Sequence, residues 1–175
     1  MEKMTAIQGS RVYDVTGGKK VLALEDAEVT LPGIEAQTFE VKAMGAYNVP
    51  LPGLFESMEM TIKATGASKQ YASISGFSTR ELYVTACQSE VAATGKITPK
   101  QLKAKVTGIA KKIGEISVNP GDASEPETTY ELSHYELYID NFLLWKVDKL
   151  TGECQVWNGS GYDDYGAQME QILGI

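Results

Sequence analysis

The last part of the chain, from Tyr130 to Ile175, constrains the fold more than any other segment. Its pieces YELSHYELYI, FLLWKVD and CQVWN are rich in aromatic and apolar residues, and short polar or glycine-containing stretches separate them. This spacing is typical of strands joined by tight turns in an antiparallel sheet. A single helix then closes the chain. We therefore predict a mainly β fold, with two antiparallel sheets packed as a sandwich or partial barrel and a flanking C-terminal helix.

The closing helix is predicted over Tyr162–Leu173. Asp163 or Asp164 can cap its start, and Gly174 stops it. Its apolar residues fall on one stripe at helical spacing, which core packing explains without any cofactor, and they are Tyr165, Met169, Ile172 and Leu173.

Chain length, net charge and cysteine content limit the classes of protein to which the chain can belong. A chain of 175 residues suits one domain with a real core, so we predict a single domain over residues 1–175. The formal net charge of −7 does not favour nucleic-acid binding by the whole surface. Cys87 and Cys154 are too few for a disulfide scaffold, and we expect buried free thiols. The amino terminus has no apolar signal segment, and the run FLLW is far too short for membrane insertion.

Two central segments alternate between apolar and polar residues, as half-buried antiparallel strands do. In Thr38–Met44, Phe39 and its alternate neighbours share one face. In Phe55–Ala64 the predicted inward residues are Met58, Met60, Ile62 and Ala64. The predicted outward residues of the same segment are Glu59, Thr61 and Lys63.

The segment Gly45–Phe55 between those strands contains two prolines, so it is predicted to be a loop outside any central ladder. An apolar loop must either fold back on its own core or dock on something else. Both interpretations stay open here, a packed loop and a docking arm that orders in an assembly. The candidate docking residues are Tyr47, Val49, Pro50, Leu51, Pro52, Leu54 and Phe55.

Charge is distributed unevenly over the middle of the chain. Residues 94–114 contain lysines and no acid, whereas residues 113–140 contain acids and no lysine or arginine. The two strips are either ordinary solvated surfaces or faces that meet head to tail between copies. Nucleic-acid binding by the lysines is the weaker interpretation, because the strip has no interleaved aromatic residues and no arginine, and the acidic strip lies close by in sequence. The candidate contacts between copies are Lys103, Lys105, Glu125 and Glu127.

The same region is predicted to form three strands. These are Arg80–Val91, Gln101–Ile109 and Ile113–Val118, and the turn residues Asn119-Pro120-Gly121 follow them.

No residue pattern points to catalysis. The single histidine, His134, lies in strand-like sequence without a nucleophile motif, and we interpret it as structural. The histidine and the two cysteines lack the short spacing of a zinc site. The Gly18-Lys19 pair lacks the rest of a phosphate loop. We therefore predict no enzyme activity, no cofactor and no metal.

The order of these segments resembles the major tail tube protein family of contractile phage tails and R-type bacteriocins. The C-terminal pieces YELSHYELYIDNFLLWKVD and CQVWNG, with the short helix ending in ILGI, carry most of the resemblance. The strand at Glu81–Glu90 and the proline-glycine loop before Phe55 are weaker matches. The segment Gly66–Gly76 is longer than in the family pattern.

The resemblance implies that six subunits form a ring and that rings stack into a tube around a lumen. Glu59, Thr61 and Lys63 are candidates for lining that lumen. The implied partners are other copies of the chain, a tail sheath protein, and tape-measure and baseplate proteins, with DNA only as passing cargo in a phage. The implied location is a virion tail or tail-like particle assembled in a bacterial cytoplasm.

A second hypothesis is a monomeric β-sandwich that binds carbohydrate or another small ligand. Aromatic side chains stack on sugars, and the residues available for it are Tyr135, Tyr138, Trp145 and Trp157. Most of them alternate within strand sequence, where burial in the core is the default.

Overall fold

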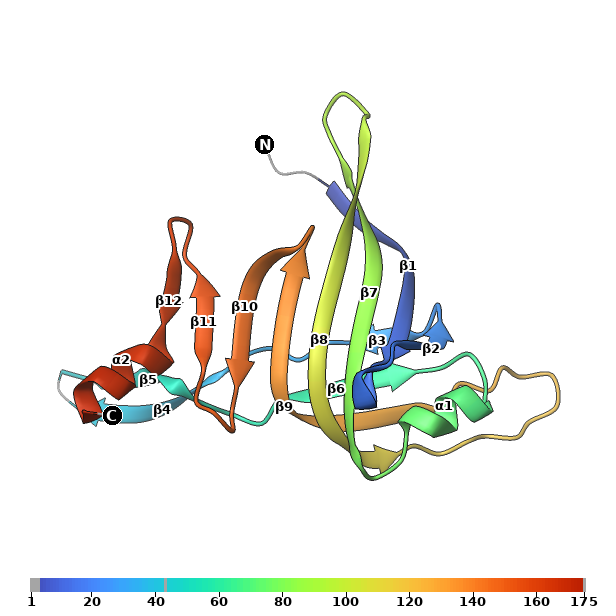
Figure 1. Cartoon of the computed structure of the whole chain (residues 1–175), viewed down its shortest axis with the longest axis horizontal. Coiled ribbons are helices and arrows are strands. Elements are labelled where there is room, and N and C mark those ends of the chain that lie inside the picture. The colour runs from blue at the N-terminus through green and yellow to red at the C-terminus, as the bar shows by residue number, and fades with distance from the viewer. Residues whose placement is uncertain (1–3, 43, 175) are drawn as a thin grey trace.

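The computed structural model describes residues 4–42 and 44–174, and within these it leaves the side chains of Pro52, Met169 and Glu170 undescribed. It is dominated by β-strands, with two short helices and one 3-10 turn (Figure 1). The strands are β1 (Met4–Asp14), β2 (Val21–Glu25), β3 (Glu28–Thr30), β4 (Ala36–Lys42), β5 (Ala46–Phe55), β6 (Glu59–Lys63), β7 (Thr79–Val91), β8 (Ile97–Ile113), β9 (Glu127–Ile139), β10 (Phe142–Asp148), β11 (Cys154–Trp157) and β12 (Tyr162–Asp164). The helical elements are η1 (Thr16–Gly18), α1 (Lys69–Ile74) and α2 (Tyr165–Leu173).

Ten of the strands form one antiparallel sheet, which we call the main sheet. Its continuous order is β12-β11-β10-β9-β8-β7-β1-β2, and the first half of β9 also pairs with β6, which pairs with β3. The other two strands, β4 and β5, pair only with each other. The prediction of a mainly β fold with two antiparallel sheets and a C-terminal helix is confirmed, although the second sheet is only a hairpin.

The core lies on one face of the main sheet and contains buried residues of its longer strands, of β6 and of α1. The alternation predicted for Phe55–Ala64 is confirmed, because Met58, Met60, Ile62 and Ala64 are all buried. The longer strands β7, β8 and β9 show the same alternation. Their buried residues include Leu82, Val84, Ala104, Val106, Tyr135 and Leu137. Alternate residues of β7, β8 and β9 therefore point to the opposite side, which we call the outer face.

Turn residues behave as the sequence predicts. Asp140 and Asn141 both have positive φ, as a two-residue hairpin between β9 and β10 needs. Gly17 and Gly18 provide positive φ between β1 and β2. At Asn119, the carbonyl accepts the N–H of Asp122 and closes the predicted turn.

The predicted strand Gln101–Ile109 is confirmed as part of a longer strand, whereas the predicted strand Ile113–Val118 was wrong. Ile97–Ile113 is one long strand, and Ile113–Val118 does not continue as a second one. Gly108 and Ala110 keep the inward face of β8 small, and a Cβ on Gly108 would lie 2.5 Å from the carbonyl oxygen of Glu131. Close contact with β9 therefore carries β8 past the point where the sequence pattern weakens.

The C-terminal helix begins later than predicted. Tyr162–Asp164 extends the main sheet as β12, and α2 starts at Tyr165. Asp164 Oδ1 accepts the N–H of Ala167, so the predicted cap is present. Gly174 has positive φ directly after the helix, as predicted for its end.

Candidate assembly surfaces

The segment Gly45–Phe55, predicted to be a loop, is mostly strand β5 in a hairpin with β4. We call this hairpin the arm, and its register runs from Lys42↔Ala46 to Ala36↔Phe55. Figure 1 shows the arm passing below β10–β12 toward α2. The loop prediction failed because proline is excluded from central ladders and not from a two-stranded hairpin with an open edge on each strand.

The arm exposes apolar side chains along much of its length. Tyr47 is 64% exposed and Leu54 48% exposed, and Phe39 on β4 is similarly open. Val49 and Leu51 are half-buried, whereas Pro50 is exposed opposite Thr38. Phe55 packs against the core, and the Pro52 side chain lies outside the described residues. The arm is therefore anchored at Phe55 and apolar beyond it.

The helix α2 adds a second exposed apolar surface beside the arm. Ile172 is 83% exposed and Leu173 is 69% exposed, so the prediction that they pack in the core was wrong for a single copy. Tyr165 does pack against the core, as predicted. The Met169 side chain lies outside the described residues.

An aromatic cluster covers the end of the main sheet near β12. The Phe142 and Trp157 ring centroids are 4.9 Å apart, and those of Trp157 and Tyr162 are 5.3 Å apart. All three rings are partly exposed, and the Tyr162 hydroxyl donates to the Leu143 carbonyl. Sequence reasoning did not group these residues, because their proximity depends on the β10–β11–β12 pairing.

The continuous path of the main sheet ends in two margins, and its branch through β6 ends in a third at β3, which within the described residues pairs only with β6. Among the described strands, none pairs with the outer edge of β12 or with the outer edge of β2. Val21 and Leu22 on β2 are partly exposed apolar residues at one margin. Unpaired N–H and C=O groups at such margins can pair with another chain.

The acidic strip is partly neutralised within one copy. Glu125 contacts Lys63 at 3.0 Å, and Lys111 contacts both Glu59 and Glu131. Glu127 is exposed and opposite Lys63 in the β6–β9 register. Lys63 belongs to β6 and Lys111 to β8, and sequence spacing does not reveal that these strands neutralise the acidic strip.

The lysines of the lysine strip lie partly in the middle of the main sheet and partly at the end of the β7–β8 hairpin. Lys103 and Lys105 lie on the outer face of β8, with β7 on one side and β9 on the other. They do not meet Glu125 or Glu127, which stay candidates for contact with another copy. Glu59, Thr61 and Lys63 lie on the side of β6 away from the core, where Glu59 and Lys111 form an ion pair.

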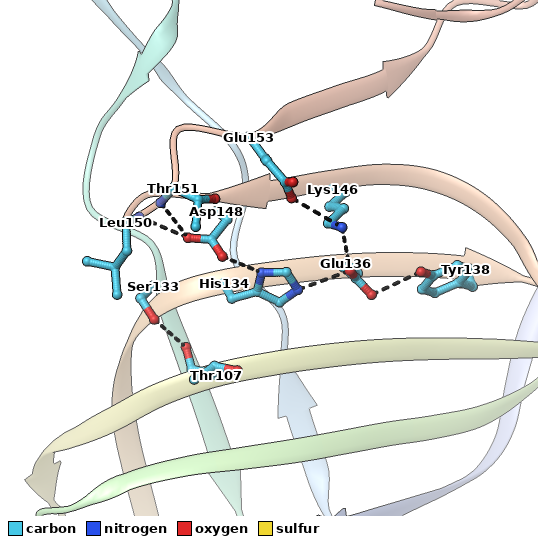
Figure 2. Close-up of polar contacts among 10 residues, drawn as sticks. All are labelled: Thr107, Ser133, His134, Glu136, Tyr138, Lys146, Asp148, Leu150, Thr151 and Glu153. Carbon is cyan, nitrogen blue, oxygen red and sulfur yellow. Dashed lines mark hydrogen bonds and ion pairs between the residues drawn. The ribbon is translucent and has the colours of Figure 1, made fainter. Parts of the chain in front are cut away.

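His134 stands at the centre of a polar network on β9 and β10 (Figure 2). Its Nδ1 is 3.1 Å from Asp148 Oδ2, and its Nε2 is 3.1 Å from Glu136 Oε1. Lys146 contacts Glu136 at 3.5 Å and Glu153 at 3.2 Å. Both ring nitrogens can donate at once only in the imidazolium form. The network joins two strands, and no nucleophile takes part in it.

The surroundings of both carboxyl groups favour their charged forms. Burial alone would raise the pKa of Glu136, but the Tyr138 hydrogen bond and the charges of His134 and Lys146 outweigh it and lower the pKa. Burial alone would likewise raise the pKa of Asp148. The N–H groups of Thr151 and Leu150, together with His134, outweigh burial and lower this pKa. Glu136 and Asp148 therefore act as ionised structural groups.

Other chemistry in the described residues is sparse. No cluster of three or more histidine, cysteine, aspartate or glutamate side chains in this part of the chain could hold a metal ion. Both cysteines are free thiols, with Cys154 buried and Cys87 half-buried, and burial raises the pKa of Cys154 to about 11. Neither described helix has the length and apolar character needed to cross a bilayer.

A mainly β protein with unpaired sheet margins and an exposed apolar arm has surfaces on which another chain can dock. The model of the family phage tail tube protein FII matches residues 12–174, and the chain belongs to this family. The resemblance to tail tube proteins is thereby confirmed. The chain is a structural subunit of a tail tube.

Solved structures of a PVC extracellular contractile injection system are also similar to the chain. A sheath–tube complex in the extended state matches with TM-score 0.47 and 15% identity, over 74% of this chain and 87% of that chain. A sheath/tube terminator in the extended state matches with TM-score 0.47 and 14% identity, over 74% and 92%. No curated protein matches the chain. None of these comparisons supports the hypothesis of a monomeric binding module.

Proposed function

We propose that the chain, as one domain over residues 1–175, builds the inner tube of a contractile tail or tail-like particle. Copies join into hexameric rings, and the rings stack around a lumen. The observation that carries this proposal is the pair of unpaired margins, β12 and β2, at opposite ends of one continuous sheet. A contact between two different margins is heterologous, and repetition of such a contact closes a ring.

The arm is proposed to bridge copies through its exposed residues. The residues involved are those predicted from sequence, namely Tyr47, Val49, Pro50, Leu51, Pro52, Leu54 and Phe55, with Phe55 acting as the anchor. Covering Tyr47 and Leu54 removes apolar surface from water, at roughly 25 cal/mol per Å² buried. Ile172 and Leu173 of α2 extend the same apolar surface.

The outer face of the main sheet is proposed to face the lumen. It is polar and carries no covering helix in Figure 1, whereas the opposite face holds the core. Glu59, Thr61 and Lys63 point away from the core and stay candidates for this lining. Glu127, the first residue of β9, and Glu125, two residues before it, are proposed to meet lysines of an adjacent copy.

The proposed partners follow from this role. A sheath protein surrounds the tube, and tape-measure and baseplate proteins contact its interior and end, in a particle assembled in the bacterial cytoplasm. We infer a purely structural role without enzyme activity. The His134 network supports this inference because it consists of hydrogen bonds and ion pairs between neighbouring strands.

Electron microscopy of the purified chain tests the proposal. We expect rings or hollow tubes as concentration rises, and Val21→Lys at the β2 margin should prevent them, because a charged edge opposes strand addition. Val118→Lys makes the same substitution at an exposed position between β8 and β9, outside every strand, so it is the matched control and should still assemble. Dispersed single copies at every concentration, with or without sheath protein, would contradict the proposal.

A further inference from the structure

Three lysines and three tyrosines gather on the outer face of the main sheet. Lys20 lies 4.2 Å from the centre of the Tyr13 ring, and Lys103 lies 4.7 Å from that of Tyr83. Lys105 lies between Tyr83 at 5.4 Å and Tyr138 at 5.2 Å. We call these six residues the lysine–tyrosine patch.

Strand register assembles the patch from four parts of the chain. Tyr13 on β1 is opposite Tyr83 on β7, and Tyr83 is opposite Lys105 on β8. Lys103 is opposite Tyr138 on β9. The aromatic residues missing from the lysine segment itself are therefore supplied by its neighbouring strands. This placement answers one objection from the sequence, the lack of aromatic residues beside the lysines.

The positive charge of the patch is not neutralised within the described part of the chain. Lys63, Lys100, Lys111 and Lys146 each contact a carboxylate, whereas no ion pair of Lys20, Lys103 or Lys105 is found there. The carboxylate opposite Lys105 is Glu136, which is already held by the His134 network. Burial, Lys105 and Lys20 together lower the pKa of Lys103. The three ammonium groups thus have no ion-pair partner among the described residues, although Glu136 lies beside the patch, opposite Lys105, and accepts a hydrogen bond from Tyr138.

The position of the patch says what kind of partner can reach it. Lys103 and Lys105 lie on β8, with β7, β1 and β2 on one side and β9 to β12 on the other. A neighbouring copy joined at a margin would contact β2 or β12 first. Lys20 directly precedes Val21 at the β2 margin, whereas the other five patch residues lie on interior strands, so a partner of the whole patch must lie across the face of the sheet.

We propose that the lysine–tyrosine patch binds the phosphate backbone of a nucleic acid lying across the outer face. Lysine acts on phosphate as a point charge, and tyrosines beside it add apolar contact that does not depend on base sequence. The acidic remainder of the molecule keeps the contact weak and reversible, as suits a chain that moves past. The patch is complete in one copy, so this proposal does not depend on ring formation.

Fluorescence anisotropy with a short labelled oligothymidylate tests the proposal on dispersed single copies of the full chain. Binding is expected at low ionic strength, and it should weaken as salt rises with a log–log slope of about −2, the value for three lysines at −0.7 each. The double variant Lys103→Gln/Lys105→Gln should weaken binding about tenfold and reduce the slope by about 1–2. Lys103→Arg/Lys105→Arg keeps the charge and should retain binding.

Lys96→Gln/Lys112→Gln is the matched control, because it removes the same charge from exposed positions of the same segment. It should change binding less than twofold, roughly the effect of net charge alone. Circular dichroism melting verifies that each variant is folded. No binding by the native chain at low salt, an equal loss in the control, or displacement by polyglutamate as effective as by unlabelled oligonucleotide would each overturn the proposal.

Discussion

At the level of single residues, the outer face is ordered by contacts between strands that sequence spacing does not reveal. His134 was interpreted as structural from its lack of partners in the sequence. The structure gives it two carboxylate partners, Glu136 from its own strand and Asp148 from the next. An ion-pair network on the non-core face fixes the register of β9 against β10 without using apolar residues.

Glu136→Gln tests the contribution of this network. At neutral pH the substitution should lower the free energy of unfolding by about 1.5–3 kcal/mol, the range for hydrogen bonds to a charged group. The folded-state pKa of Glu136 lies below the ordinary value of 4.5. Its contribution to the free energy of unfolding is therefore fully present above pH 4.5 and is lost as the pH falls through the folded-state pKa.

Urea unfolding from pH 7 down to pH 3 measures both effects. The loss of stability on acidification should be smaller in Glu136→Gln than in the native chain. Glu153→Gln, which removes a more exposed partner of Lys146, is the control and should keep the native pH profile. Identical profiles for the native chain and Glu136→Gln would show that Glu136 does not contribute in this way.

At the level of elements, the arm shows that residues whose sequence is typical of a loop can form a strand. Pro50 and Pro52 lie within β5, yet β5 pairs with β4 over most of its length. Beyond Phe55 the core contributes little to the stability of the arm. The conformation of β5 therefore depends on its pairing with β4 and on whatever covers Tyr47 and Leu54.

Tyr47→Ser/Leu54→Ser separates folding from assembly. Both side chains are largely exposed, so the stability of the single copy should change by less than about 0.5 kcal/mol. Tube formation should be lost, because the apolar surface of the arm is removed. Sedimentation and electron microscopy measure assembly, and thermal melting measures stability.

Thr38→Ser/Asn48→Ser is the control on the same hairpin, since it changes polar residues and keeps the apolar surface. This variant should assemble like the native chain. Normal tubes from Tyr47→Ser/Leu54→Ser would exclude the arm as an assembly contact.

At the level of the whole molecule, one curved sheet carries a core on one side and a polar face on the other, with margins at both ends (Figure 1). A single copy therefore leaves backbone groups and apolar side chains exposed that a neighbour can cover. Much of the stability of the working particle is expected to lie between copies.

The unfolding temperature should consequently depend on the state of assembly. Association with folded copies only stabilises the folded state by mass action, so assembled tubes should melt at a higher temperature than dispersed copies. Differential scanning calorimetry at several protein concentrations, on both preparations, measures the difference. An unfolding temperature independent of concentration and assembly would contradict a large energetic contribution from contacts between copies.

The sequence by itself determined the strand alternation, the turns and the class of fold. Met58, Met60 and Ile62 are inward because a strand places every second residue on one face, a local rule that needs no tertiary information. Asp140-Asn141 and Gly17-Gly18 likewise fix hairpins through their tolerance of positive φ. These local preferences made the mainly β fold predictable.

Only the tertiary structure decided which residues from distant strands share a surface. The continuous strand β8, the β5 hairpin, the exposed Ile172 and Leu173, and the patch around Lys103 all depend on strand order and register. Pairing between strands is a long-range choice made by the whole core, and a one-residue change of register would move every side chain to the other face. For that reason the sequence predicted the kind of molecule and the structure located its surfaces.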